Sequence, residues 1–144
     1  MKTTNLLLVI IIAMTLFNCN NNDSDTSKKS ETQSNKSDHI TVQFLKSEFD
    51  SGKKFYLLDV RTIPEFNQGR LSFANDLIPY DALPQHLDKL PQDKEATIYL
   101  FCRSGRRSGI ATKFLRSAGY NESYNITGGI IAWQNAGFEI VSGN

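Results

Sequence analysis

Residues 97–118, TIYLFCRSGRRSGIATKFLRSA, contain the strand, loop and helix that decide the fold of this chain. The apolar run 97–101 predicts a strand that is buried on both faces. In residues 107–118 apolar side chains recur at helical spacing, and Gly119 is suited to end that helix. Between the strand and the helix lies a short loop that begins with Cys102, and three arginines, at 103, 106 and 107, follow this cysteine within five residues. A strand joined to a helix in this way indicates an α/β protein.

The remainder of residues 38–144 alternates between strand and helix patterns in the same manner. Thr62 and Glu65 have the spacing of a capping box, with a proline in the first turn of the helix that they begin. Alternation of this kind predicts a mostly parallel sheet with helices on both faces. The predicted strands are 40–42, 55–60, 77–78, 97–101 and 123–126, the predicted helices are 42–52, 62–66, 81–90, 107–118 and 128–137, and 138–141 is an edge strand or a tail.

The N-terminal residues have the composition of an export signal. Residues 6–17, LLLVIIIAMTLF, would span about 18 Å as a helix, against a hydrocarbon core of ~30 Å, so they suit a signal peptide better than a membrane span. The following LFNC resembles the processing site of a bacterial lipoprotein, although Asn18 departs from the usual small residue. This resemblance implies a signal peptide over residues 1–18 and lipidation of Cys19. An ordinary secretory signal and an uncleaved anchor are the alternatives.

Residues 20–37 contain no apolar side chain, so they have nothing to bury in a core. We therefore expect residues 19–37 to form a disordered polar tether between the membrane and a folded domain over residues 38–144. A lipid-anchored protein of the cell envelope, facing the periplasm or the cell surface, is the predicted location.

The charge balance argues against a nucleic-acid partner. Residues 1–18 contain one lysine and no acid, so the rest of the chain has 15 basic and 15 acidic residues. The cluster formed by Arg103, Arg106 and Arg107 is therefore a local feature that suits a small anion. The chain has two cysteines without metal-ligand spacing and two isolated histidines, which predicts neither a metal site nor a bound cofactor.

Cys102 has the surroundings of a reactive thiol. Gly105 permits a tight turn in which successive N–H groups face an anion, and the start of the next helix adds positive potential. An ordinary thiol has a pKa of ~8.5, and these groups would lower it enough to favour the thiolate at neutral pH. The alternative is a buried cysteine that acts as a small apolar side chain. Asp59 and Arg61 follow the predicted strand 55–60, and in such sheets ligands bind at the carboxyl ends of the strands.

Three ordered motifs resemble those of the rhodanese family of single-domain sulfurtransferases. They are LLDVRTIPEF at 57–66, CRSGRRS at 102–108 and GYNESYNITGGIIAWQNAGFEI at 119–140, so that the resemblance covers about residues 40–141. It implies a three-layer α/β fold with a five-stranded, mostly parallel central sheet. One stretch departs: GRLSFA at 69–74 stands where the family commonly has GHIPGA, which leaves substrate preference open.

The same resemblance implies a mechanism and residue roles. Cys102 would take sulfane sulfur from a small anionic donor, thiosulfate or a persulfide, hold it as a persulfide, and give it to a thiol or cyanide. Asp59 and Arg61 would brace the loops. The residues implied in donor and persulfide binding are Arg103, Ser104, Gly105, Arg106 and Arg107.

Two other functions compete with sulfur transfer. Phosphatases and arsenate reductases of similar fold use a Cys-x5-Arg loop, whereas this chain has Ser108 in the arginine position. A non-catalytic binding or sulfur-carrier module is the second alternative, because a fold and a motif do not guarantee turnover. A disulfide oxidoreductase is disfavoured, since the folded part has no resolving cysteine. The oligomeric state and the physiological donor and acceptor are not predicted.

Overall fold

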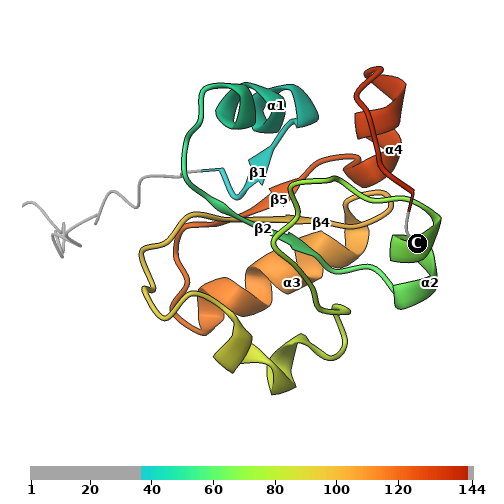
Figure 1. Cartoon of the computed structure of the whole chain (residues 1–144). Helices are drawn as coiled ribbons and strands as arrows, with labels where there is room; N and C mark the ends of the chain where they lie inside the picture. The colour runs from blue at the N-terminus through green and yellow to red at the C-terminus, as the bar shows by residue number, and fades with distance from the viewer. Residues whose placement is uncertain (1–36, 143–144) are drawn as a thin grey trace, which may run out of the picture. The chain divides into compact units, whose positions relative to one another are not determined.

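The computed structural model describes residues 37–142 and has one sheet of five parallel strands at its centre (Figure 1). The strands lie in the order β1-β5-β4-β2-β3. The predicted α/β fold with a five-stranded sheet is confirmed, and all five strands are parallel. Their bounds are β1 His39–Ile40, β2 Tyr56–Asp59, β3 Asp76–Leu77, β4 Ile98–Phe101 and β5 Ser123–Ile126.

The register of the central strands brings the two loops expected to carry the chemistry to one edge. Asp59 at the end of β2 lies opposite Phe101 at the end of β4. Arg61 and Cys102, which follow these strands, therefore leave the sheet side by side. β2, β4 and β5 are almost entirely buried, which explains why the sequences of β2 and β4 are largely apolar runs without alternation.

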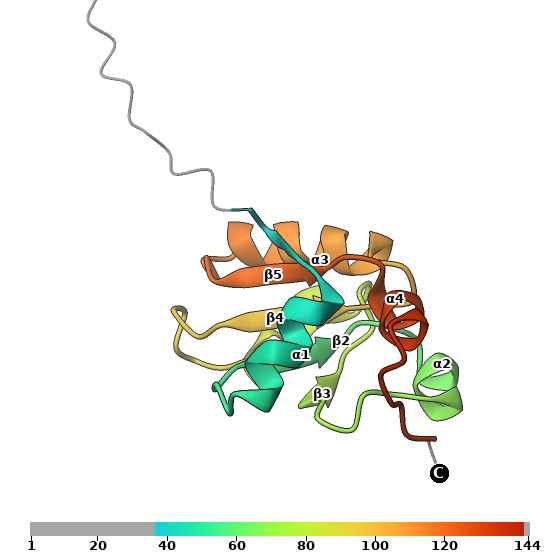
Figure 2. The same ribbon diagram turned by 90° about the horizontal axis from the view of Figure 1, so that it is seen from above.

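Helices cover both faces of the sheet and so make three layers (Figures 1 and 2). α3 (Arg106–Ser117) lies on one face, where Leu115 is fully buried in a core that also contains Leu58 and Leu100. α1 (Val42–Asp50) and α4 (Gly129–Asn135) lie on the other face. The second core, between these helices and the sheet, includes Leu45 and Trp133.

The short helix α2 (Ile63–Gln68) begins with the capping box expected from the sequence. The Thr62 hydroxyl accepts a hydrogen bond from the Glu65 amide at 3.4 Å, and the Glu65 carboxylate accepts one from the Thr62 amide at 3.1 Å. These two bonds satisfy donors that the first turn of a helix otherwise leaves free. They also hold the Glu65 side chain above the carboxyl end of β2.

The prediction of a helix over residues 81–90 is wrong. The chain instead forms two 3₁₀ turns, Leu83–Gln85 and Leu87–Lys89, separated by His86 at φ −129° and ψ 30°. A proline disfavours the α conformation at the residue before it, and both Leu83 and Leu90 precede a proline. Leu90 is extended, with φ −79° and ψ 162°. The two prolines, at 84 and 91, therefore interrupt the helical pattern near both of its ends. Leu83 and Leu90 are nevertheless buried, as their spacing suggested.

Residues 138–141 form a tail rather than a strand of the sheet. Its end is held by an isolated antiparallel bridge between Arg70 and Val141, and the Arg70 guanidinium also donates to the Ser142 carbonyl at 3.4 Å. The indole N–H of Trp133 donates to the Glu139 carbonyl at 2.8 Å and fixes the tail against α4.

The export signal, the lipidated Cys19 and nearly all of the tether lie outside the described residues, so they stay predictions. Within residues 37–142 no helix is long and apolar enough to cross a membrane.

Candidate active site

The loop after β4 is tied to the beginning of α4 by its carbonyl groups. The Cys102 carbonyl accepts a hydrogen bond from the Ile130 amide at 2.9 Å, and the Arg103 carbonyl accepts one from the Ile131 amide at 3.2 Å. With these carbonyls held against α4, the following amides turn toward the cysteine sulfur. The Gly105 amide donates to Cys102 Sγ at 3.2 Å.

Two glycines make this arrangement possible. Gly105 has φ +92°, and a Cβ there would lie 3.1 Å from the Gly128 nitrogen. Gly129 has φ +56°, and a Cβ there would lie only 2.2 Å from the Cys102 carbonyl oxygen. Both residues therefore combine a left-handed backbone with close contact between chain segments, which a larger side chain does not fit. The sequence indicated the role of Gly105 but not the contact of Gly129.

The sulfur of Cys102 is buried but has polar neighbours. The residue is 1% exposed, and the Ser108 hydroxyl lies 3.4 Å from Sγ. Burial raises the pKa of the thiol. Hydrogen bonds from the Ser108 hydroxyl and from the amides of Ser108, Ser104 and Gly105 together lower this pKa by more than burial raises it, so the net shift is downward. The burial agrees with the apolar-cysteine alternative, whereas the hydrogen bonds are those of an anion site.

The three arginines of the loop have different environments. Arg107 forms two hydrogen bonds to the Glu65 carboxylate, at 2.7 Å and 2.6 Å, and is half-buried. These bonds raise the pKa of Arg107, and the nearby Cys102 thiolate adds to the effect. Arg103 and Arg106 are exposed. We expected all three arginines to bind the sulfur donor. The Glu65 carboxylate competes for Arg107 and largely neutralises its charge.

Glu65 consequently connects the start of α2 with α3 through its side chain. Its carboxylate contacts Arg107 of α3 while it caps α2 through Thr62. Hydrogen bonds from Arg107, together with those from Thr62, lower the pKa of Glu65 to about 2. The sequence showed only the capping role, because the partner lies 42 residues away.

Asp59 and Arg61 form a buried ion pair at the end of β2. The Arg61 Nη2 lies 2.6 Å from Asp59 Oδ2, and both side chains are almost inaccessible. The remaining guanidinium N–H groups donate to the carbonyls of Glu65, at 3.2 Å, and Gly69, at 2.8 Å. Arg61 therefore connects the end of β2 to the carbonyls of Glu65, within α2, and Gly69, at its C-terminal end. Bracing of the loops by this pair stays a prediction, as does its alternative, a simple ion pair at the strand end.

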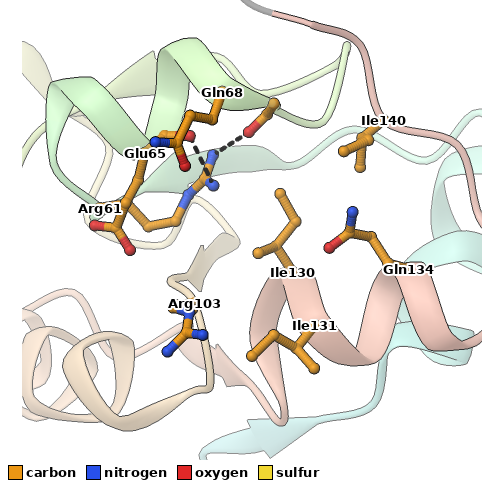
Figure 3. A pocket seen from close by; sticks show the side chains of 9 residues that line it. Arg61, Glu65, Gln68, Arg103, Ile130, Ile131, Gln134 and Ile140 are labelled. Carbon is orange, nitrogen blue, oxygen red and sulfur yellow. Dashed lines mark hydrogen bonds between the residues drawn. The ribbon is translucent and has the colours of Figure 1, made fainter.

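A pocket of about 290 Å³ lies between α2 and α4, next to the loop (Figure 3). Arg103 lies at its edge, the apolar side chains of Ile130 and Ile131 come from α4, and Arg61 is fixed beneath α2 by its two carbonyl partners. Gln68 and Gln134 supply amide groups. Cys102 does not line this pocket, which therefore adjoins the thiol without containing it.

No cluster of three or more His, Cys, Asp or Glu side chains in residues 37–142 is arranged to hold a metal ion.

Three further polar residues near the sulfur were not predicted as site residues. Ser108 was used in the sequence only to exclude a phosphatase loop, yet its hydroxyl contacts the sulfur. Asn125 accepts a hydrogen bond from that hydroxyl at 2.6 Å, and His39 lies 3.0 Å from the Asn125 amide nitrogen. A polar residue within an otherwise buried strand, as Asn125 is in β5, was the available signal.

The comparison with known proteins agrees with this geometry. Residues 41–136, which include the cysteine loop, match the Rhodanese-like domain family. The chain belongs to this family. The mixed α/β fold with its five-stranded parallel sheet is that of a rhodanese-like domain, as the sequence motifs suggested.

Several relatives of this rhodanese-like domain are named as sulfurtransferases, and one from Bacillus subtilis, 29% identical over 94 residues, is named as a putative sulfur carrier protein. One from Allochromatium vinosum is 41% identical over 86 residues, covering 60% of this chain and 78% of that protein. The probable adenylyltransferase/sulfurtransferase MoeZ of Mycobacterium tuberculosis is 37% identical over 103 residues, covering 70% of this chain but 26% of that protein. The crystal structure of a rhodanese-like domain protein from Staphylococcus aureus is 34% identical with a TM-score of 0.63, covering 72% of this chain and 98% of that one. At the level of the family, the chemistry is sulfur transfer.

Proposed function

We propose that this protein transfers sulfane sulfur from thiosulfate or a persulfide donor to a thiol or cyanide acceptor through a persulfide on Cys102. The observation that supports it is the sulfur environment: a buried thiol that receives a hydrogen bond from the Gly105 amide, at 3.2 Å, and has the Ser108 hydroxyl 3.4 Å from its sulfur. These donors suit an anionic sulfur and have no role around a purely apolar cysteine.

In the first half-reaction the Cys102 thiolate attacks the outer sulfur of thiosulfate. A new S–S bond forms, the bond between the outer sulfur and the sulfonate breaks, and sulfite leaves with the electron pair. The product is a persulfide whose terminal sulfur is anionic. The amides of Ser104, Gly105 and Ser108 stabilise negative charge near this position, as they do for the thiolate.

In the second half-reaction a nucleophile takes the terminal sulfur. Cyanide attacks it and forms thiocyanate, or a thiolate attacks it and forms a new persulfide, and in both cases the electrons of the broken S–S bond return to Cys102. The low exposure of Cys102 restricts the donor to a small molecule or the end of an extended chain. The exposed Arg103 and Arg106 supply positive charge for a doubly negative donor such as thiosulfate.

The geometry gives less support to a phosphatase. Ser108 occupies the position of the arginine in a Cys-x5-Arg loop, and its buried side chain is hydrogen-bonded to Asn125 at 2.6 Å. Arg107, the preceding residue, is paired with Glu65. Neither side chain is free to hold three phosphate oxygens.

The test is intact mass spectrometry of the full chain with Cys19→Ser, which leaves Cys102 as the single cysteine. After exposure to thiosulfate we expect a gain of one sulfur atom that cyanide removes, with thiocyanate released at steady turnover. The matched control adds Cys102→Ser and gains no sulfur. A sulfur adduct without thiocyanate turnover would favour a sulfur carrier, and absence of the adduct would reject both.

A further inference from the structure

A continuous chain of hydrogen-bonding side chains leads from the buried sulfur to the surface. The Ser108 hydroxyl lies 3.4 Å from Cys102 Sγ and 2.6 Å from Asn125 Oδ1. Asn125 Nδ2 lies 3.0 Å from His39 Nδ1, and His39 Nε2 lies 3.2 Å from Asp38 Oδ1. Ser108 and Asn125 are buried, whereas the His39 side chain is 51% exposed. We call Ser108, Asn125 and His39 the hydrogen-bond chain.

The Ser108 hydroxyl has one proton and two possible acceptors. When it donates to the Asn125 oxygen, its own oxygen is left to accept a hydrogen bond from the S–H group of Cys102. When it donates to the sulfur, the thiolate is stabilised, and the Ser108 oxygen then needs a donor. Only the NH₂ group of Asn125, after rotation of its amide, can be that donor among the contacts of Ser108 in the described residues.

The orientation of the Asn125 amide is coupled to the protonation of His39. As it stands, the NH₂ group of Asn125 faces His39 Nδ1, which must be an acceptor and therefore carry no proton. The rotated amide would place an oxygen there, which requires a proton on Nδ1. Because the Asp38 carboxylate already favours a proton on Nε2, both ring nitrogens are then protonated and the ring is positively charged.

We infer that His39 is a positioning residue for sulfur transfer: protonated, it turns Asn125 and so directs the Ser108 hydroxyl to the sulfur of Cys102. This inference rests on the proposed function for its biological meaning, but the coupling itself needs no sulfur donor. The other charged groups that face the two ends are Asp38, beside His39, and the Arg107–Glu65 pair, beside the sulfur.

The experiment is the rate of Cys102 alkylation by iodoacetamide from pH 5 to pH 9, in the full chain with Cys19→Ser. Alkylation forms an S–C bond, releases iodide and reports the thiolate. We expect two ionisations in the profile, with a rate below neutral pH that falls less steeply than a single thiol ionisation allows. His39→Gln, which keeps polar groups but does not titrate, should leave one ionisation. His86→Gln, at the other histidine of the chain, should keep both.

A second pair of variants tests whether the effect passes through Ser108. Ser108→Ala should lower the alkylation rate at pH 7 by about tenfold, the equivalent of one hydrogen bond to a charged group. In that background, adding His39→Gln should change the profile no further. If His39→Gln gives the wild-type profile, or acts equally with and without the Ser108 hydroxyl, the inference is overturned.

These outcomes are separate from those of the proposed function. A chain that shows two ionisations but never gains sulfur would retain the coupling and refute the sulfur transfer. A chain that gains and releases sulfur but shows one ionisation would do the opposite.

Discussion

Gly129→Ala is the substitution that most directly tests how α4 holds the cysteine loop. A Cβ at this position would lie 2.2 Å from the Cys102 carbonyl oxygen and 2.8 Å from the Arg103 carbonyl carbon and oxygen. Real Cβ atoms essentially never approach other atoms within 3.0 Å, so the loop or the helix must move by at least about 0.8 Å, the difference between 3.0 Å and 2.2 Å.

Two costs combine at Gly129. The left-handed conformation, at φ +56°, costs an alanine about 1–2 kcal/mol, and overpacking against backbone costs about 1–3 kcal/mol. We therefore expect the free energy of unfolding to fall by about 2–5 kcal/mol. At roughly 4–8 °C for each kcal/mol in a domain of this size, the melting temperature falls by at least about 8 °C.

The matched control is Gly137→Ala, just beyond the other end of α4. Gly137 also has a positive φ, +76°, but a Cβ there would have no heavy atom within 4 Å. It should lose only the conformational term, about 1–2 kcal/mol. The difference between the two variants isolates the contact with the Cys102 carbonyl.

The rate of sulfur loading should also differ between the Gly129→Ala and Gly137→Ala variants. A displacement approaching 1 Å in a loop that orients the reacting sulfur can reduce a rate by about 10²-fold, whereas Gly137 lies away from the loop. Thermal melts followed by circular dichroism, and single-turnover loading of sulfur from thiosulfate below the melting temperature, give both quantities. Equal losses of stability and of loading rate in the two variants would refute the claim that this contact positions the loop.

Two more predictions concern Glu65 and the N-terminus. The pKa of Glu65 is lowered from 4.5 to about 2, so its stabilising contribution is fully present above pH 4.5 and is lost as the pH falls toward 2. Glu65→Gln should lower the free energy of unfolding by about 1–3 kcal/mol at pH 7. Urea denaturation should show this deficit shrinking below pH 4.5; a deficit that is constant down to pH 3 would contradict the role of the Arg107 pair. Cys19→Ser should move the protein expressed in a bacterium from the membrane fraction to the soluble fraction, and unchanged partition would count against lipidation at Cys19.

Much of the fold follows from local patterns. Apolar runs in β2 and β4 predicted buried strands, and the Thr62–Glu65 spacing predicted the beginning of α2. The cysteine loop was recognisable for a similar reason. A thiol at the end of a buried strand, a glycine and a helix start lie within a few residues, and their effects on one another depend mainly on that short separation.

Interactions between distant residues decided the rest. The order of the strands, the Arg107–Glu65 pair across 42 residues and the Asn125–His39 contact across 86 residues depend on the assembled sheet. The two 3₁₀ turns at residues 83–89 replaced a helix, because the leucines reached the core without one.

By itself the sequence determined that a reactive cysteine would lie at the carboxyl edge of a parallel sheet, because strand, loop and helix propensities act over neighbouring residues. Only the tertiary structure decided which groups contact that sulfur. Ser108 reaches it across one turn of the loop, and Asn125 and His39, from other strands of the sheet, are linked to it through the Ser108 hydroxyl. Hydrogen bonds extend only about 3 Å, so partners that lie far apart in the chain meet only when the whole domain has folded.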